Sequence, residues 1–207
     1  MLKTLIVIVI AYLFGSVPWA LVIGKVFYHK DVRQYGSGNL GASNAGRVLG
    51  KPAAVAVTIL DAVKALLAMI IANAIQPSAV CYAGLACCIG HCFPVFAQFK
   101  GGKAVAASYG FIVGVCALIT RSWLLLIVPV ACFFIILYIC RMVSVSSILS
   151  LLIAAVMSFI LKSPAEVSVC LVILWLFVTY RHRSNISRIR SGTESKIKWM
   201  GEKHGKN

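Results

Sequence analysis

Seven long apolar stretches run through this sequence, and a chain with that many can bury them only in lipid. They cover residues 4–23, 52–72, 79–98, 104–120, 122–140, 142–161 and 164–180. Each has about the length that a helix needs to cross the hydrocarbon core of a bilayer. Only 12% of the residues are charged, which is about half the usual fraction in a soluble domain. The sequence therefore predicts an all-α membrane protein with seven transmembrane helices, in a single domain over residues 1–207.

The spans leave two alternatives open. Only a few residues around Gly101 separate the stretches 79–98 and 104–120, so five spans with re-entrant pieces are an alternative to seven. The first stretch is too long for the apolar region of a signal peptide and lacks a small-residue cleavage site, so we expect a helix. Gly15 and Pro18 should bend this helix, and a neighbour must then satisfy the backbone carbonyl that the bend releases.

Positive charges are distributed unevenly between the loops. If the spans alternate in direction, sixteen Lys and Arg residues fall on one side of the membrane and three on the other, with Lys64 inside a span. Because cytoplasmic loops carry the excess of Lys and Arg, the N-terminus is predicted outside and the C-terminus in the cytoplasm. The net charge of +15 also suits anionic substrates. Nucleic acid is not expected as a partner, because no separate soluble basic domain is present.

Eight cysteines lie within or at the ends of the apolar stretches. This placement is typical of buried free thiols and not of the disulfide framework of a small secreted protein. Cys88, His91 and Cys92 share one helix face, which would allow a metal site, but no fourth ligand is evident. A hydrogen-bonded His91 inside the bundle is the stronger interpretation. Neither a metal nor another cofactor is predicted.

The first polar cluster covers residues 36–47 and reads GSGNLGASNAGR. Its glycines let the backbone turn N–H groups toward an anion, and Arg47 offers a guanidinium fork that matches phosphate oxygens. A flexible loop is the alternative. We favour a phosphate-binding loop, because the amide and hydroxyl donors are dense and the segment ends in a base.

The second polar cluster covers residues 90–103 and reads GHCFPVFAQFKGGK. Gly101, Gly102 and Lys103 directly precede the predicted helix 104–120, and the N–H groups at a helix start attract anions. The Walker A pattern is absent. A tight turn with interfacial lysines is the alternative, but Gly-Gly-Lys at a helix start favours phosphate binding.

The third polar cluster covers residues 181–194 and reads RHRSNISRIRSGTE. His182 and Asn185 are three residues apart and can share a helix face. The alternative is a basic amphipathic segment that binds anionic lipid. Such an anchor has no need of His182, Asn185 or the acid Glu194.

Two smaller polar groups complete the candidates. Ser144 lies near a span end on the same predicted side, where serines also cap or pack. Asp61 and Lys64 lie inside a span three residues apart, and buried ionisable residues of this kind are usually paired. We expect them to form a mutual structural pair.

In order and spacing, the three clusters resemble the three motifs of the acyl-phosphate-dependent glycerol-3-phosphate acyltransferase family of bacterial membranes. Smaller matches occur at 15–18 and 141–148, so the resemblance covers nearly the whole chain. Ser43, Ala104 and Ala107 depart from the family, which usually has Thr, Gly and Thr there. The resemblance implies transfer of a fatty acyl group from acyl phosphate to the 1-hydroxyl of glycerol 3-phosphate, giving lysophosphatidic acid and phosphate. This is the first acylation step of bacterial phospholipid synthesis.

The resemblance also implies the site residues. The implied catalytic residues are Ser37, Arg47, Lys103, His182 and Asn185. The implied substrate-binding residues are Gly38, Asn39, Ser43, Asn44, His91, Gly101, Gly102 and Ser144. We assign to Arg47 and Lys103 the neutralisation of phosphate charge, and to His182 and Asn185 the positioning of glycerol phosphate.

A catalytic triad is not evident, and no histidine is followed by Asp five residues later, as in the commoner acyl-CoA-dependent enzymes. Direct attack by the glycerol hydroxyl is therefore favoured, because an acyl phosphate has a good leaving group and orientation and charge neutralisation can suffice. The alternative function is a small membrane transporter of an anionic metabolite. Transporters usually bind near the membrane midplane and often show inverted repeats, whereas these donors crowd one side.

The expected partners are acyl phosphate, glycerol 3-phosphate and membrane lipid, and an enzyme that makes acyl phosphate is a further candidate. The expected location is the bacterial inner membrane, with several spans. The three clusters are expected to form one cationic basin that faces the cytoplasm.

Overall fold

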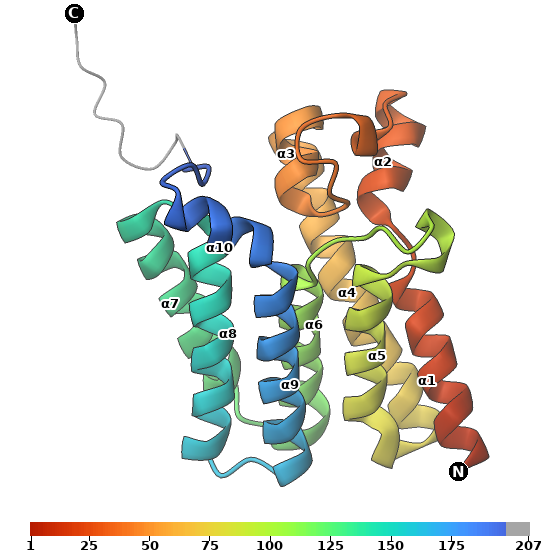
Figure 1. Cartoon of the computed structure of the whole chain (residues 1–207). Coiled ribbons are helices and arrows are strands. Elements are labelled where there is room, and N and C mark those ends of the chain that lie inside the picture. Colours follow the sequence, from red (N-terminus) through yellow and green to blue (C-terminus); the bar gives the residue numbers. More distant parts are fainter. Residues whose placement is uncertain (198–207) are drawn as a thin grey trace, which may run out of the picture. The chain divides into compact units, whose positions relative to one another are not determined.

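The computed structural model describes residues 1–197, and these residues form helices and loops without a strand. The helices are α1 (Leu2–Gly15), α2 (Trp19–Tyr28), α3 (Ala42–Leu49), α4 (Lys51–Ile75), α5 (Val80–Cys92), α6 (Val105–Val115), α7 (Leu124–Cys140), α8 (Val143–Ile160), α9 (Ala165–Arg181) and α10 (Arg183–Arg190) (Figure 1). The predicted all-α architecture is confirmed. Lys198, Lys203 and Lys206, which contribute to the charge asymmetry, lie outside the described residues.

Helix occupies each of the seven predicted apolar stretches. Among the described residues, four helical segments are long and apolar enough to cross a membrane: Leu2–Tyr28, Lys51–Ile75, Pro77–Ala97 and Val143–Ile160. A fifth candidate is the bent pair Ala165–Arg181 and Arg183–Arg190, whereas Val105–Thr120 and Leu124–Cys140 are apolar but shorter. The chain is therefore a multi-pass membrane protein. The number seven and the outside N-terminus remain predictions.

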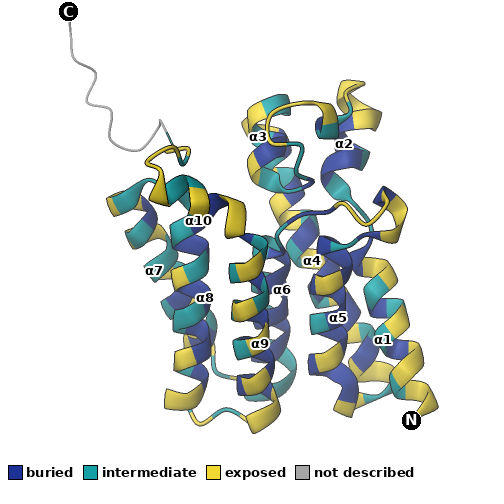
Figure 2. Cartoon of the chain, viewed as in Figure 1, coloured by how far each residue is buried: buried dark blue, intermediate teal, exposed yellow. Residues whose placement is uncertain are grey.

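The chain divides into two compact units, Met1–Arg121 and Ser122–Asn207, and the single domain over 1–207 remains a prediction. In the first unit, α4 packs against α1, α3, α5 and α6, and α1 also packs along α5. In the second unit, α8 packs between α7 and α9, and α10 follows α9. Figure 2 shows that the buried residues of most helices lie along one side and exposed residues along the other.

Many exposed residues of these helices are large and apolar. On α7, Ile139 is 75% exposed and Phe134 54% exposed. Surfaces of this kind are unfavourable in water when they are extensive, but they suit the hydrocarbon core of a bilayer. The exposure pattern thus supports the same conclusion as the hydropathy, that lipid is the solvent for most of the chain.

The first apolar stretch is broken between α1 and α2, as predicted from Gly15 and Pro18. In a continuous helix the Val17 carbonyl would accept from the Leu21 N–H, but that N–H bonds the Pro18 carbonyl instead. The Lys64 ammonium of α4 donates to the Val17 oxygen over 2.9 Å. The predicted compensation by a neighbour is therefore confirmed, and it comes from the predicted buried lysine.

Candidate active site

Asn44 organises the first glycine-rich loop. It lies in the first turn of α3, is 1% exposed, and uses both ends of its side-chain amide. Its Oδ1 accepts from the Ser37 backbone N–H over 2.8 Å and from the Ser37 hydroxyl over 3.2 Å. Its Nδ2 donates to the carbonyls of Val32 and Tyr35 over 2.9 and 3.2 Å. Asn44 therefore stabilises the loop from a buried position, because both polar atoms of its side chain are hydrogen-bonded to loop residues.

The other candidates of this loop reach the surface. Ser37 and Arg47 are exposed, and so is Ser43 in the first turn of α3. Gly36 and Gly38 adopt positive φ angles of 61° and 67°, which L-residues with a Cβ rarely accept. The first cluster thus exposes the Ser37 hydroxyl and the Arg47 guanidinium. The conformation of its loop depends on Gly36 and Gly38.

The first and second polar clusters meet within the first unit. The Asn39 side-chain amide donates to the Gly101 carbonyl over 3.2 Å, although these residues are 62 positions apart. A cavity of about 430 Å³ lies at this junction, and it is lined by Asp31, Arg33, Gln34, Gly38, Gln98 and Lys100. The hydrogen bonds from Arg33 hold the pKa of the Asp31 carboxyl at about 2, so Asp31 is ionised at neutral pH.

The Gly-Gly-Lys segment directly precedes α6, as predicted, with Ala104 as the N-cap residue. Gly101 and Gly102 are buried and Lys103 is half-buried. The Gly102 N–H donates to the His91 carbonyl over 3.0 Å. His91 itself is 6% exposed and lies beneath this segment at the end of α5.

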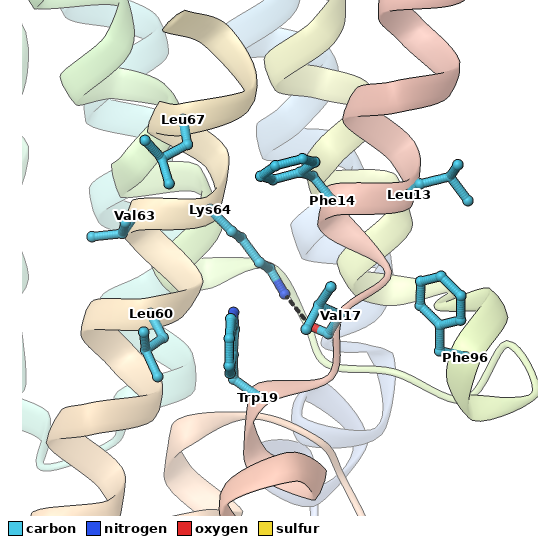
Figure 3. A pocket seen from close by; sticks show the side chains of 9 residues that line it. All are labelled: Leu13, Phe14, Val17, Trp19, Leu60, Val63, Lys64, Leu67 and Phe96. Atoms are coloured by element: carbon cyan, nitrogen blue, oxygen red, sulfur yellow. Dashed lines mark hydrogen bonds between the residues drawn. The ribbon is translucent and has the colours of Figure 1, made fainter. Parts of the chain in front are cut away.

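The predicted pair Asp61 and Lys64 is confirmed, with 2.8 Å between Lys64 Nζ and Asp61 Oδ1. His91 joins it, because its Nδ1 lies 3.0 Å from Lys64 Nζ and 3.3 Å from Asp61 Oδ1. The aliphatic part of Lys64 borders a cavity of about 390 Å³ (Figure 3). The other lining residues are apolar or aromatic: Leu13, Phe14, Val17, Trp19, Leu60, Val63, Leu67 and Phe96.

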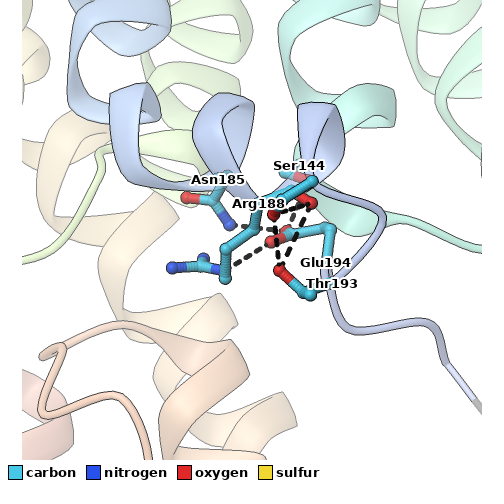
Figure 4. A network of polar contacts seen from close by, with 6 residues as sticks. Ser144, Asn185, Arg188, Thr193 and Glu194 are labelled. Atoms are coloured by element: carbon cyan, nitrogen blue, oxygen red, sulfur yellow. Dashed lines mark hydrogen bonds and ion pairs between the residues drawn. The ribbon is translucent and has the colours of Figure 1, made fainter.

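In the second unit, Glu194 connects three polar side chains (Figure 4). Its Oε1 accepts from the Ser144 hydroxyl over 2.7 Å and from the Asn185 amide over 2.6 Å. Its Oε2 accepts from Arg188 Nε over 2.8 Å. Burial alone would raise the pKa of the Glu194 carboxyl, but these hydrogen bonds outweigh it and hold the pKa below its usual value. The ionised carboxylate thus fixes the position of Asn185 relative to α8.

His182 lies at the junction of α9 and α10, where the helix bends by 57°. His182 is the N-cap residue of α10 and its carbonyl accepts from the Ile186 N–H over 2.9 Å, so His182 and Asn185 both belong to the first turn of α10. The ring Nδ1 of His182 lies 2.8 Å from the Val178 carbonyl. Since a carbonyl only accepts, Nδ1 carries the proton and Nε2 is the accepting nitrogen of the neutral ring.

The structure therefore gathers the candidates into two groups. The first unit holds Ser37, Gly38, Asn39, Ser43, Asn44, Arg47, His91, Gly101, Gly102 and Lys103. The second unit holds Ser144, His182 and Asn185. The central role of Glu194 was only weakly indicated in the sequence, by one acid in a very basic segment. The contact between His91 and the Asp61–Lys64 pair was not predicted, because it depends on how α4 and α5 pack.

Among residues 1–197, no cluster of three or more His, Cys, Asp or Glu side chains could hold a metal ion. Cys88 and Cys92 are buried and form no disulfide.

The class that fold and site define is a multi-pass membrane protein with two glycine-rich segments, each ending in a basic residue. The family model described as glycerol-3-phosphate acyltransferase matches residues 5–192. The chain belongs to this family.

Among curated relatives, the glycerol-3-phosphate acyltransferase of Bacillus velezensis is 43% identical, over 94% of this chain and 98% of the relative. That of Listeria monocytogenes is 42% identical, over 92% of this chain and 95% of the relative.

Two solved structures of PlsY, described as an integral membrane glycerol 3-phosphate acyltransferase, are similar to this chain. The glycerol 3-phosphate form has a TM-score of 0.86 at 33% identity, covering 94% of this chain and 96% of the other. The lysophosphatidic acid form has a TM-score of 0.83 at the same identity, covering 94% and 95%. The predicted family is thus confirmed.

Proposed function

We propose that this protein transfers a fatty acyl group from acyl phosphate to the 1-hydroxyl of glycerol 3-phosphate. Family membership and the glycerol 3-phosphate and lysophosphatidic acid forms of the similar structures support the acceptor and the product. The donor is inferred from the chemistry that the site residues can supply.

The environment of His182 carries the inference about the donor. A histidine that activates a nucleophile is usually oriented by a carboxylate, but His182 Nδ1 bonds the Val178 carbonyl. The Glu194 carboxylate in the same unit accepts hydrogen bonds from Ser144, Asn185 and Arg188. A site that works by orientation and charge neutralisation suits a donor whose leaving group departs readily. Acyl phosphate meets this requirement.

The proposed reaction is a direct displacement. The oxygen of the glycerol 1-hydroxyl forms a bond to the acyl carbon, and the bond from that carbon to the phosphate oxygen breaks. Inorganic phosphate leaves, and the hydroxyl proton passes to a phosphate oxygen. Arg47 and Lys103 neutralise phosphate charge, and the backbone around Gly38, Gly101 and Gly102 supplies further N–H donors.

His182 and Asn185 hold the glycerol phosphate in this proposal, with Ser37 as a hydroxyl donor. Asn39 and Ser43 support the phosphate, and Ser144 acts through Glu194. Asn44 and His91 shape the loops from beneath instead of contacting substrate. The clusters are proposed to face the cytoplasm at the inner membrane, where an enzyme that makes acyl phosphate could deliver the donor.

A transporter of an anionic metabolite is the competing function, and detergent separates the two. Purified protein in micelles, which enclose no compartment, is supplied with acyl phosphate and labelled glycerol 3-phosphate. Formation of labelled lysophosphatidic acid in proportion to protein supports the enzyme. Absence of product, together with uptake of glycerol phosphate by sealed proteoliposomes, would favour the transporter.

A further inference from the structure

Three ionisable side chains from two helices converge inside the first unit. Asp61 and Lys64 belong to α4 and His91 to α5, and all three are at most 6% exposed. Lys64 Nζ lies 2.8 Å from Asp61 Oδ1, 3.0 Å from His91 Nδ1 and 2.9 Å from the Val17 carbonyl. The three hydrogens of the ammonium group thus have three acceptors.

His91 Nδ1 lies between two partners, 3.0 Å from Lys64 Nζ and 3.3 Å from Asp61 Oδ1. Because an ammonium group only donates, a neutral ring that accepts from the closer Lys64 carries its hydrogen on Nε2. Asp61 provides a negative charge beside Lys64. A buried ammonium group needs such a partner, because the cavity along the aliphatic part of Lys64 is lined mainly by apolar side chains.

The opposite edge of the His91 ring faces the phosphate-loop segment. A Cβ atom at Gly102 would collide with Nε2 of His91, and one at Gly101 would collide with the His91 carbonyl. The Gly102 N–H donates to that same carbonyl. The His91 ring and the backbone of Gly101 and Gly102 are therefore in direct contact. If the ring turned toward these glycines, their backbone would have to shift.

If Asp61 and Lys64 served only to neutralise each other's charge, no third side chain would be needed. The third member, His91, links the pair to the segment that ends in Lys103, two residues before α6 begins at Val105. Since displacement of binding groups by about 1 Å can cost about a hundredfold in rate, the orientation of this ring matters for a site on that loop.

We propose that Asp61, Lys64 and His91 are positioning residues that hold the Gly101–Gly102 backbone in its phosphate-binding shape. Lys64 orients the His91 ring by donating to Nδ1, and the ring supports the loop through its Nε2 edge. Asp61 holds the Lys64 side chain in place through their 2.8 Å contact. The inference rests on the proposed function, because it assigns the loop to substrate phosphate.

The test compares single and double substitutions. Lys64→Met and Asp61→Asn each leave one buried charge without its partner, so both are expected to lower thermal stability. The double variant Asp61→Asn/Lys64→Met removes both charges together and should melt above either single variant, although it still leaves the Val17 carbonyl without its donor. It still lacks the donor to His91 Nδ1, so its kcat/KM should fall about 10–100-fold.

Met69→Ala is the matched control for lost packing. Met69 is buried in the same helix and contacts Gly84 and Gly114, away from the loop. Its kcat/KM is expected within about twofold of the wild type at temperatures below melting. If the double variant keeps wild-type kcat/KM, or if losses follow melting temperature alike in all variants, the positioning role is refuted.

A second measurement does not depend on turnover. In ¹⁵N-histidine spectra of the purified protein, with His91 assigned through a His91→Asn variant, the wild-type ring should show the Nε2–H tautomer. In the double variant this pattern should change, and glycerol 3-phosphate should shift the His91 signal of the wild type only. An unchanged His91 spectrum in the double variant would overturn the proposal. Lack of acyl transfer by the wild type would instead overturn the proposed function.

Discussion

Asn44 shows how one buried amide can determine the shape of a binding loop. Asn44→Ala removes the partner of the Ser37 N–H and of the carbonyls of Val32 and Tyr35. Unsatisfied buried groups cost about 1–3 kcal/mol, so we expect a loss of unfolding free energy in this range together with most of the activity. Denaturation in detergent and the acyltransfer assay measure the two effects. Asn73→Ala, at an exposed position of α4, is the control, and equal behaviour of both variants would contradict the assignment.

Lys103 carries the charge of the second cluster. Lys103→Met preserves the length of the side chain but removes the ammonium group, and turnover is expected to fall at least about a hundredfold, because charge stabilisation is a large part of such catalysis. The melting temperature should change little. Lys100→Met is the comparison, since Lys100 is exposed in the same segment and should matter far less. Near-normal rates for Lys103→Met would refute its role.

The lowered pKa of Glu194 predicts how the stability of the protein depends on pH. Because the hydrogen bonds lower its pKa in the folded protein, the carboxylate stabilises the fold above its ordinary pKa of about 4.3. That contribution is lost as the pH falls through the lowered value. Melting temperatures between pH 7 and pH 3 should therefore drop more for the wild type than for Glu194→Gln. Parallel curves for the two proteins would show that the network adds no pH-dependent stability.

At the scale of helices, the close packing of α1 on α5 is a sensitive feature. A Cβ at Gly15 would collide with the Cys87 carbonyl, and one at Gly90 with the Tyr12 carbonyl. Small residues allow such approach between membrane helices. Gly15→Leu should therefore separate the helices and cost about 1–3 kcal/mol or more, measured as a lower melting temperature. Leu5→Ala, at an exposed position of α1, should cost much less, and the reverse order would contradict this packing.

The helices also show what could be predicted from the sequence. Hydropathy located the helical stretches, and Pro18 located the break between α1 and α2. The spacing of Asp61 and Lys64 indicated their pairing, because residues three apart share a helix face. The bend at His182 was not predicted, since no Gly or Pro marks it. The position of His91 beside Lys64 depends on the packing of two helices, which no local pattern records.

The candidate site could be predicted only in part for a similar reason. The order of the three motifs indicated the candidate residues. The structure shows which of them hold the loops in shape from a buried position and which reach the surface. Asn44 has the same residue type as Asn39, but only the fold reveals that Asn44 is buried and occupied. Glu194 stood out as the one acid in a basic segment, whereas its partners Ser144 and Arg188 required the structure.

For the whole molecule, the charge asymmetry predicts the orientation in the membrane. Single cysteines at exposed Gln34 and Ser187 should react with a membrane-impermeant thiol reagent from the cytoplasmic side, and one at exposed Glu166 from the opposite side. The native cysteines, all within residues 1–197, are buried or half-buried and form no disulfide, so the unsubstituted protein serves as the background. Labelling of positions 34 and 187 from opposite sides would refute a shared cytoplasmic face for the first and third clusters.

The most direct measurement offers purified protein three acyl donors in parallel with labelled glycerol 3-phosphate: acyl phosphate, acyl-CoA and acyl carrier protein carrying the same chain. We expect labelled lysophosphatidic acid from acyl phosphate alone, with release of one inorganic phosphate per product and no product from Lys103→Met. Efficient transfer from either thioester, or none from acyl phosphate, would contradict the proposed reaction.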